Sequence, residues 1–152
     1  MMASDQELRI LAALVADSDA PRKRIADDLK LSESSLSKQI SSLEHRKIIG
    51  GFTVELNYRE LGFSTHAISF VTLKDQGQIP ALLEHLSKIN EAIEIYTVLG
   101  DDDVYIRWLC RDNAHLMAVL KEVLSGPNIA HVKTTTLAEE RKRERGPSLL
   151  KK

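Results

Sequence analysis

The hydrophobic pattern of the chain changes its period at Gly50-Gly51, and this change divides the sequence into two kinds of structure. Before the two glycines, apolar residues recur every three or four positions, which is the spacing of one face of an α-helix. After them, apolar and polar residues alternate, which is typical of a half-buried β-strand. The sequence therefore predicts a helical N-terminal part, followed by a mixed part that is built around a β-sheet.

A capping box marks the start of the first helix. Ser4 is followed three residues later by Glu7, and an apolar helical series begins directly behind them. In such a box, each of the two side chains accepts a hydrogen bond from a backbone N–H at the start of the helix. We expect this helix to end near Asp17, because a turn follows that contains Pro21, a residue suited to the first position of the next helix.

Two further short helices with a tight turn between them are predicted over residues 22–50. The first covers residues 22–30, and Ser32 has the residue type that caps a following helix. The second covers residues 33–45, and its apolar stripe consists of Leu36, Ile40 and Leu43. Three helices with apolar stripes can share a small core, so residues 1–50 are predicted to form a helix-turn-helix domain.

The face of the 33–45 helix that lies opposite its apolar stripe carries small polar residues and few charges. This face consists of Ser34, Lys38, Ser41, Ser42 and His45. Such residues suit insertion into the major groove of DNA, where bulky or acidic groups would clash with the phosphates. The alternative interpretation is a helical hairpin whose serine-rich face is simply solvated.

The residues predicted to contact DNA fall into two groups. Those on the 33–45 helix and at its start are Ser32, Ser34, Ser35, Ser37, Lys38, Gln39, Ser41 and Ser42. The basic residues that flank the helices are better placed for phosphates than for bases, and they are Arg22, Lys23, Arg46 and Lys47.

Charge is distributed unevenly along the chain, whose net charge is −1. Residues 1–51 hold eight basic and eight acidic residues, residues 52–137 hold seven and eleven, and residues 138–152 hold six and three. A neutral DNA-reading part gains little affinity from counterion release as a single copy. If the chain binds DNA, we therefore expect a dimer or a larger assembly that combines several half-sites.

The mixed part has the element order β-α-β-β-α-β. Strands are predicted over residues 65–74, 92–99, 104–110 and 128–137, and helices over residues 78–90 and between Asp112 and Gly126. This order is that of the ferredoxin-like fold, in which both helices cover one face of an antiparallel sheet. The predicted fold class is α+β, with an N-terminal helix-turn-helix domain and a C-terminal ferredoxin-like βαββαβ domain.

These patterns divide the chain into four parts. The helix-turn-helix domain covers residues 1–50, and the ferredoxin-like domain covers residues 64–138. Between them, residues 51–63 are predicted to form a linking strand, in which apolar and polar residues alternate, and a turn. The charged tail of residues 139–152 has too few apolar residues to pack and is expected to be mobile or to contact phosphates.

Several classes of site are disfavoured. Cys110 is the single cysteine, which excludes an internal disulfide framework and a cysteine-based zinc site within one chain. Apolar runs are far shorter than a membrane helix needs, and the acidic N-terminus is unlike a signal sequence, so we expect a cytoplasmic protein without membrane partners. Three consecutive aspartates, residues 101–103, suggest a metal site, but neighbouring side chains diverge in a turn, so no metal is expected.

The whole arrangement resembles the Lrp/AsnC family, the leucine-responsive or feast/famine transcription regulators of bacteria and archaea. The resemblance runs from Asp5 to about Ala138 and rests on the order and spacing of three segments. They are DQELRILAAL, LKLSESSLSKQISSLEHRKIIGGF and YTVLGDDDVYIRW.

The resemblance implies a regulator that binds double-stranded DNA and is not an enzyme. It implies a homodimer formed through the C-terminal sheets, assembly into octamers or other higher oligomers, and no cofactor other than an amino-acid effector bound between subunits. It places that effector at the G-D-x-D turn, at Gly100, Asp101 and Asp103. The alternative interpretation is an ordinary hairpin turn, because glycine and aspartate are common turn residues.

The recognition helix departs from the family pattern, which usually has an arginine where Gln39 stands. Direct base discrimination is therefore expected to be soft, with DNA shape contributing much of the specificity. Two other interpretations remain open. One is a sensor or assembly protein without DNA binding, which the neutral N-terminal part would suit. The other is an enzyme similar to the sirohaem decarboxylases, with His66, Arg107 and Arg111 binding substrate carboxylates.

Overall fold

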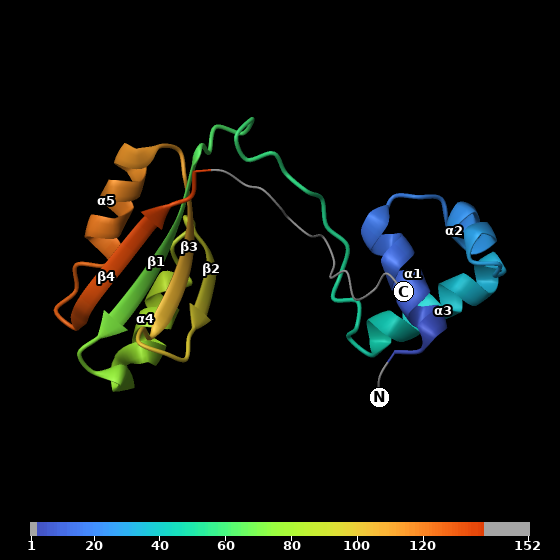
Figure 1. Ribbon diagram of the computed structural model, residues 1–152, viewed down its shortest axis with the longest axis horizontal. Helices are drawn as coiled ribbons and strands as arrows, with labels where there is room; N and C mark the ends of the chain where they lie inside the picture. The colour runs from blue at the N-terminus through green and yellow to red at the C-terminus, as the bar shows by residue number, and fades with distance from the viewer. Residues whose placement is uncertain (1–2, 139–152) are drawn as a thin grey trace. The chain divides into compact units, whose positions relative to one another are not determined.

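The computed structural model describes residues 3–138, so the predicted charged tail of residues 139–152 lies outside the described residues. The chain divides between Glu55 and Leu56 into two compact units (Figure 1). We call residues 3–55 the helical unit and residues 56–138 the sheet unit, and each is described by itself.

The helical unit contains the three predicted helices, α1 (Asp5–Ala16), α2 (Arg22–Asp28) and α3 (Glu33–His45). The buried apolar residues of the three helices form one core, which consists of Ile10, Leu14, Ile25, Ala26, Leu36, Ile40 and Leu43. Pro21 is the N-cap of α2 and not its first residue. The turn between α2 and α3 is closed by a hydrogen bond from the Leu31 N–H to the Ala26 carbonyl, at 2.8 Å.

The sheet unit has the order β-α-β-β-α-β, which confirms the ferredoxin-like prediction. Its elements are β1 (Thr65–Leu73), α4 (Ile79–Leu86), β2 (Ala92–Thr97), β3 (Val104–Cys110), α5 (Asn113–Val123) and β4 (Ile129–Thr136), with a 3₁₀ turn, η1 (Gln76–Gln78), before α4. The sheet order is β2-β3-β1-β4, and every neighbouring pair is antiparallel. Among the helices of residues 3–138, none is long and apolar enough to cross a membrane.

One face of the sheet packs against α4 and α5 to form the core of the sheet unit. Alternate residues of β1 and β3 point into this core together with Leu86 of α4 and Leu116 of α5. Trp108 is fully buried there, and its indole N–H donates a hydrogen bond to the Ser69 hydroxyl at 2.8 Å. The sequence alone did not decide whether Trp108 faces the core, and the structure shows that it does.

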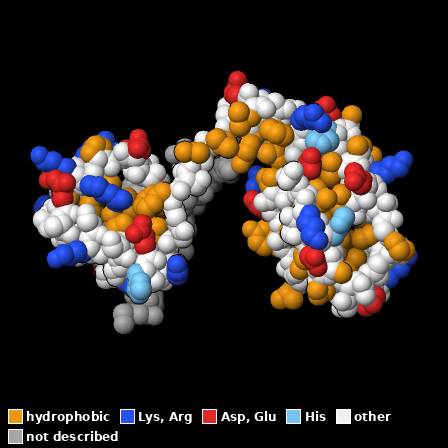
Figure 2. Space-filling model, turned by 180° about the vertical axis from the view of Figure 1, so that it is seen from behind, with side chains coloured by type: hydrophobic (Ala, Val, Ile, Leu, Met, Phe, Trp, Pro, Cys, Tyr) orange, Lys and Arg blue, Asp and Glu red, His pale blue; other side chains and the backbone are white. Residues whose placement is uncertain are grey.

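The predicted linking strand differs from the observed structure. Residues 51–57 form no strand, and the turn follows at residues 58–62. A strand needs a neighbouring strand to satisfy its backbone groups, and no strand within residues 3–138 pairs with this segment. We call residues 51–57 the connecting segment. Its apolar side chains are exposed, Val54 by 75%. Figure 2 shows hydrophobic side chains along this segment.

Two predicted boundaries in the sheet unit were too wide. The helix predicted over residues 78–90 is α4, which ends at Leu86, with Gln78 in η1, and the strand predicted over residues 92–99 is β2, which ends at Thr97. The Asp75 side chain caps η1 by accepting a hydrogen bond from the Gly77 N–H at 2.9 Å. At the other helix, Asp112 caps α5 as predicted, by accepting from the His115 N–H at 2.7 Å.

Candidate nucleic-acid interface and effector turn

Helix α3 presents two distinct faces. Its apolar stripe is buried in the core of the helical unit, and the opposite side is exposed. The exposed residues among those predicted to contact DNA from this helix are Ser34, Ser37, Lys38, Ser41 and Ser42. Together they form a continuous small polar surface, which we call the α3 polar face, with the Lys38 ammonium as its cation.

The other predicted contacts at the start of α3 have roles within the helix. The Ser32 hydroxyl caps α3 by accepting from the Ser35 N–H at 3.2 Å, and it lies 3.1 Å from the Ser34 hydroxyl. Ser35 and Gln39 are half-buried on the flank of the helix, and the Gln39 amide lies 3.5 Å from the Ser35 hydroxyl. These residues therefore fix the start of α3 beside the polar face.

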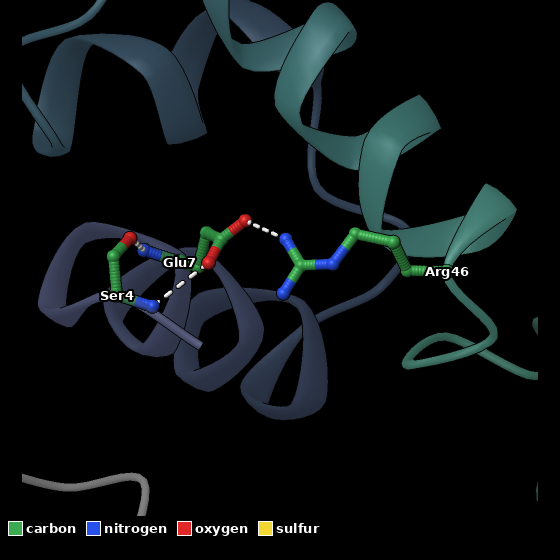
Figure 3. Close-up of polar contacts among 3 residues, drawn as sticks. All are labelled: Ser4, Glu7 and Arg46. Carbon is green, nitrogen blue, oxygen red and sulfur yellow. Dashed lines mark hydrogen bonds and ion pairs between the residues drawn. The ribbon is translucent and has the colours of Figure 1, made fainter. Parts of the chain in front are cut away.

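Three of the four flanking basic residues are exposed. Arg22 and Lys23 lie at the start of α2, and the Arg22 guanidinium is 5.8 Å from the centre of the Phe52 ring. Lys47 follows α3 with a left-handed φ of 59°. Arg46 differs, because its guanidinium turns inward and pairs with Glu7 (Figure 3).

The predicted effector turn joins β2 to β3. Gly100 has a φ of 151°, a conformation that favours glycine, and apart from its chain neighbours no atom of residues 3–138 lies within 4 Å of the position a Cβ would take. A ligand could therefore approach the backbone closely. The Asp101 side chain is exposed beside it.

Asp103 is held inside the protein. It is buried, and its carboxylate accepts hydrogen bonds from the Leu73 N–H at 2.8 Å and the Gln76 amide at 2.9 Å. Asp102 accepts from the Thr72 hydroxyl at 2.9 Å. The three aspartates thus point to different partners, and the structure ties the turn to the end of β1 and to η1.

Substitution of Asp103 should cost stability. Asp103→Ala leaves the buried Leu73 N–H without its acceptor, which should lower the free energy of unfolding by about 1–3 kcal/mol. Urea unfolding followed by circular dichroism would measure the loss. Asp101→Ala in the same turn removes the same charge from an exposed position and should change stability by less than about 0.5 kcal/mol. Equal losses for both variants would show that the buried hydrogen bonds of Asp103 are unimportant.

Each of the three residues considered for an enzyme interpretation contacts a different side chain. Arg107 of β3 pairs with Glu94 of β2 at 2.9 Å, and Arg111 lies against the His115 ring. The His66 ring packs beside Tyr58, at 6.1 Å between ring centres. Each side chain is held by a different neighbour.

Sequence reasoning missed two contacts: the hydrogen bond from Gln76 to Asp103 and the ion pair between Arg46 and Glu7. Gln76 lies 27 positions from Asp103, and Arg46 lies 39 positions from Glu7, so no local pattern links them. The capping box did identify Glu7, but only as a partner of Ser4. A capping box uses only one carboxylate oxygen of Glu7. The other oxygen needs a further donor, and this could have prompted a search for a distant cation.

The chain thus combines a three-helix unit of the helix-turn-helix type, in which the α3 polar face is exposed, with a ferredoxin-like sheet unit. The Lrp/AsnC ligand binding domain family matches residues 66–147, which is more than half of the chain. The chain belongs to the Lrp/AsnC family of transcription regulators.

Relatives and solved structures agree with this assignment. The chain is 29% identical over 140 residues to an HTH-type transcriptional regulator of Pyrococcus furiosus, covering 91% of this chain and 93% of the relative. It is 28% identical over 119 residues to LrpA of Pyrococcus horikoshii, covering 78% and 84%. The fold matches Escherichia coli AsnC with a TM-score of 0.87 at 19% identity, over 94% of this chain and 97% of AsnC.

A second structural match is a Neisseria meningitidis transcriptional regulator solved as a complex with L-Met, with a TM-score of 0.88 at 17% identity and 97% coverage of both chains. The protein is thus a transcription regulator of the Lrp/AsnC type and not an enzyme, and regulators of this family bind DNA and form oligomers. The sirohaem-decarboxylase interpretation was wrong.

Proposed function

We propose that the protein regulates transcription in the cytoplasm by inserting the α3 polar face into the DNA major groove, as a homodimer or a larger assembly such as an octamer. The observation that carries this proposal is the exposure of Lys38 and its neighbouring serines on the side of α3 opposite its fully buried stripe. Arg22, Lys23 and Lys47, which flank the helices in the sequence, are also exposed and would contact phosphates.

Two unpartnered apolar surfaces support self-association. On the sheet face away from α4 and α5, Phe70 and Tyr105 stack edge-on at 5.6 Å, and Tyr105 lies 5.8 Å from Tyr96, which is largely exposed. The connecting segment exposes alternate apolar residues, Phe52 and Val54 among them, which would gain backbone hydrogen bonds by pairing with a second copy. A second copy would cover both surfaces and supply a second recognition helix.

Charge also favours more than one copy. On the face shown in Figure 2, the basic side chains of the helical unit are interspersed with acidic ones. The phosphate attraction of one helical unit is therefore weak, and linked half-sites would raise the affinity.

An effector would act at the Gly100 turn. The open space beside Gly100 and the exposed Asp101 suit a small ligand with an ammonium group, such as an amino acid bound between subunits. The structural neighbour solved with L-Met supports an amino acid as the class of effector. Such a ligand would change DNA binding only if it bound two assemblies with different affinities.

The test is binding of the purified full chain to DNA from upstream of its own gene, across a salt series, with and without a pool of amino acids. We expect salt-sensitive binding that the pool alters, and light scattering should report a dimer or larger species. Binding that the pool leaves unchanged would contradict the effector part alone. Absence of binding at low salt would contradict the DNA part and favour the sensor or assembly interpretation.

A further inference from the structure

A single carboxylate connects the start of α1 to the end of α3 (Figure 3). One oxygen of Glu7 accepts the Ser4 N–H at 2.8 Å, which closes the capping box of α1. The other oxygen accepts a hydrogen bond from the Arg46 guanidinium. Arg46 is the C-cap of α3, so this ion pair joins two helices at positions 39 residues apart.

The pair is shielded from solvent. The Glu7 and Arg46 side chains are 14% and 29% exposed, whereas in the ion pair between Arg24 and Asp17 the side chains are 58% and 50% exposed. The second terminal nitrogen of Arg46 is buried and makes no hydrogen bond with the described residues. The guanidinium is therefore committed to the interior of the helical unit and is not displayed for a phosphate.

The Glu7 carboxyl carries its negative charge at neutral pH. The hydrogen bond from the Ser4 backbone lowers the pKa of the Glu7 carboxyl below its usual value, partial desolvation opposes this, and Arg46 lowers it further. The carboxylate is consequently ionised throughout the neutral range, and the ion pair persists there.

The pair adds a constraint that the apolar core does not supply. Leu36, Ile40 and Leu43 fix which face of α3 is buried, but apolar contacts are not directional. A charge-assisted hydrogen bond at the last turn of α3 has a defined direction and distance. It therefore fixes the end of the recognition helix relative to α1.

We propose that Glu7 is a positioning residue for DNA recognition, which holds α3 in its reading orientation through Arg46. The inference rests on the proposed function, in which the α3 polar face reads DNA. It also reassigns Arg46 from a phosphate contact to an internal anchor.

The test is the Glu7→Gln variant of the full chain. Glutamine also closes a capping box, so α1 keeps its cap while Arg46 loses its anionic partner. We expect affinity for a specific site from the upstream DNA to fall about tenfold, because a charge-assisted hydrogen bond is lost. Affinity for unrelated DNA and the salt dependence of binding should be unchanged, because no phosphate contact is removed.

A matched control separates position from charge. Asp5→Asn removes the same charge from the same first turn of α1, and Asp5 is exposed. It should leave specific affinity within about twofold of wild type. The charge-reversed double variant Glu7→Arg with Arg46→Glu should recover specific affinity relative to Glu7→Arg alone, because both lack the Ser4 cap and only the double variant restores the ion pair, with opposite polarity.

The opposite result has a distinct signature. If Arg46 contacts phosphate and Glu7 only competes for it, Glu7→Gln should bind all DNA more tightly and with a steeper salt dependence, and this would overturn the proposal. Circular dichroism at the assay temperature must show native helix content in each variant. Absence of specific binding by the wild-type protein, or binding unaffected by Lys38→Ala, would instead refute the proposed function. The role of Glu7 in DNA recognition, which rests on that function, would fall with it.

Discussion

The Lys38→Glu variant should weaken specific DNA binding by at least about 100-fold. Lys38 is the only cation between Glu33 and Glu44, and it is exposed on the α3 polar face. A charge-assisted hydrogen bond to DNA contributes about 1.5–3 kcal/mol, and a dimer loses two of them. The new carboxylate would also repel the phosphates. Fluorescence anisotropy with labelled upstream DNA at fixed salt would measure the change in Kd.

The control for this charge reversal lies on another element. Lys121→Glu changes the net charge by the same amount at an exposed position of α5 in the sheet unit. It should alter the Kd by less than about threefold at physiological salt, which screens exposed charges that make no direct contact with the DNA. If Lys38→Glu and Lys121→Glu weaken binding equally, the effect is one of net charge, and α3 does not enter the groove.

Local signals in the sequence were sufficient for most of the fold. The capping box at Ser4 and the apolar stripe of α3 predicted helices whose observed bounds agree closely. Local composition also predicted all four strands of the sheet: β-branched and aromatic residues for β1, the Gly-Asp turn for β2 and β3, and alternation for β4. These features depend on residues within one element, so a single sequence contains them.

Features that depend on a distant partner could not be predicted. Alternation at Phe52 and Val54 indicated a strand, but a strand forms only beside another strand, and none of the described strands pairs with this segment. Arg46 was predicted to contact phosphates, but it pairs with Glu7, which lies in another helix. Asp101 is exposed and Asp103 is buried, although the two residues belong to the same turn, and no local pattern predicted this difference.

In the candidate sites too, features within one element could be predicted, and features that depend on a distant partner could not. The exposed side of α3 is implied directly by the stripe that it opposes, so most of its polar face could be predicted. The resemblance predicted an effector site at the turn of residues 100–103, but the side chains within this turn have different surroundings. Asp101 is free to meet a ligand, whereas Asp103 binds the Leu73 backbone and Gln76. Substitutions at Asp101 are therefore the better probe of effector binding.

Trp108→Ala should be the most destabilising single substitution considered, lowering the free energy of unfolding by about 3–5 kcal/mol. Trp108 is fully buried between the sheet and its helices, and removal of the indole leaves a large cavity. It also removes the donor to Ser69, whose hydroxyl lies 2.7 Å from the Thr134 hydroxyl and so keeps one partner. Urea unfolding followed by far-ultraviolet circular dichroism would measure the change.

Two comparisons separate cavity from hydrogen bond. Trp108→Phe fills most of the space but lacks the N–H, so its cost should be smaller, about 1–2 kcal/mol, if packing dominates. Leu99→Ala removes a large apolar side chain at a fully exposed position and should have almost no effect. Similar losses for the alanine and phenylalanine variants would mean that the hydrogen bond from the Trp108 indole to Ser69, rather than the buried apolar volume, accounts for most of the contribution of Trp108 to stability.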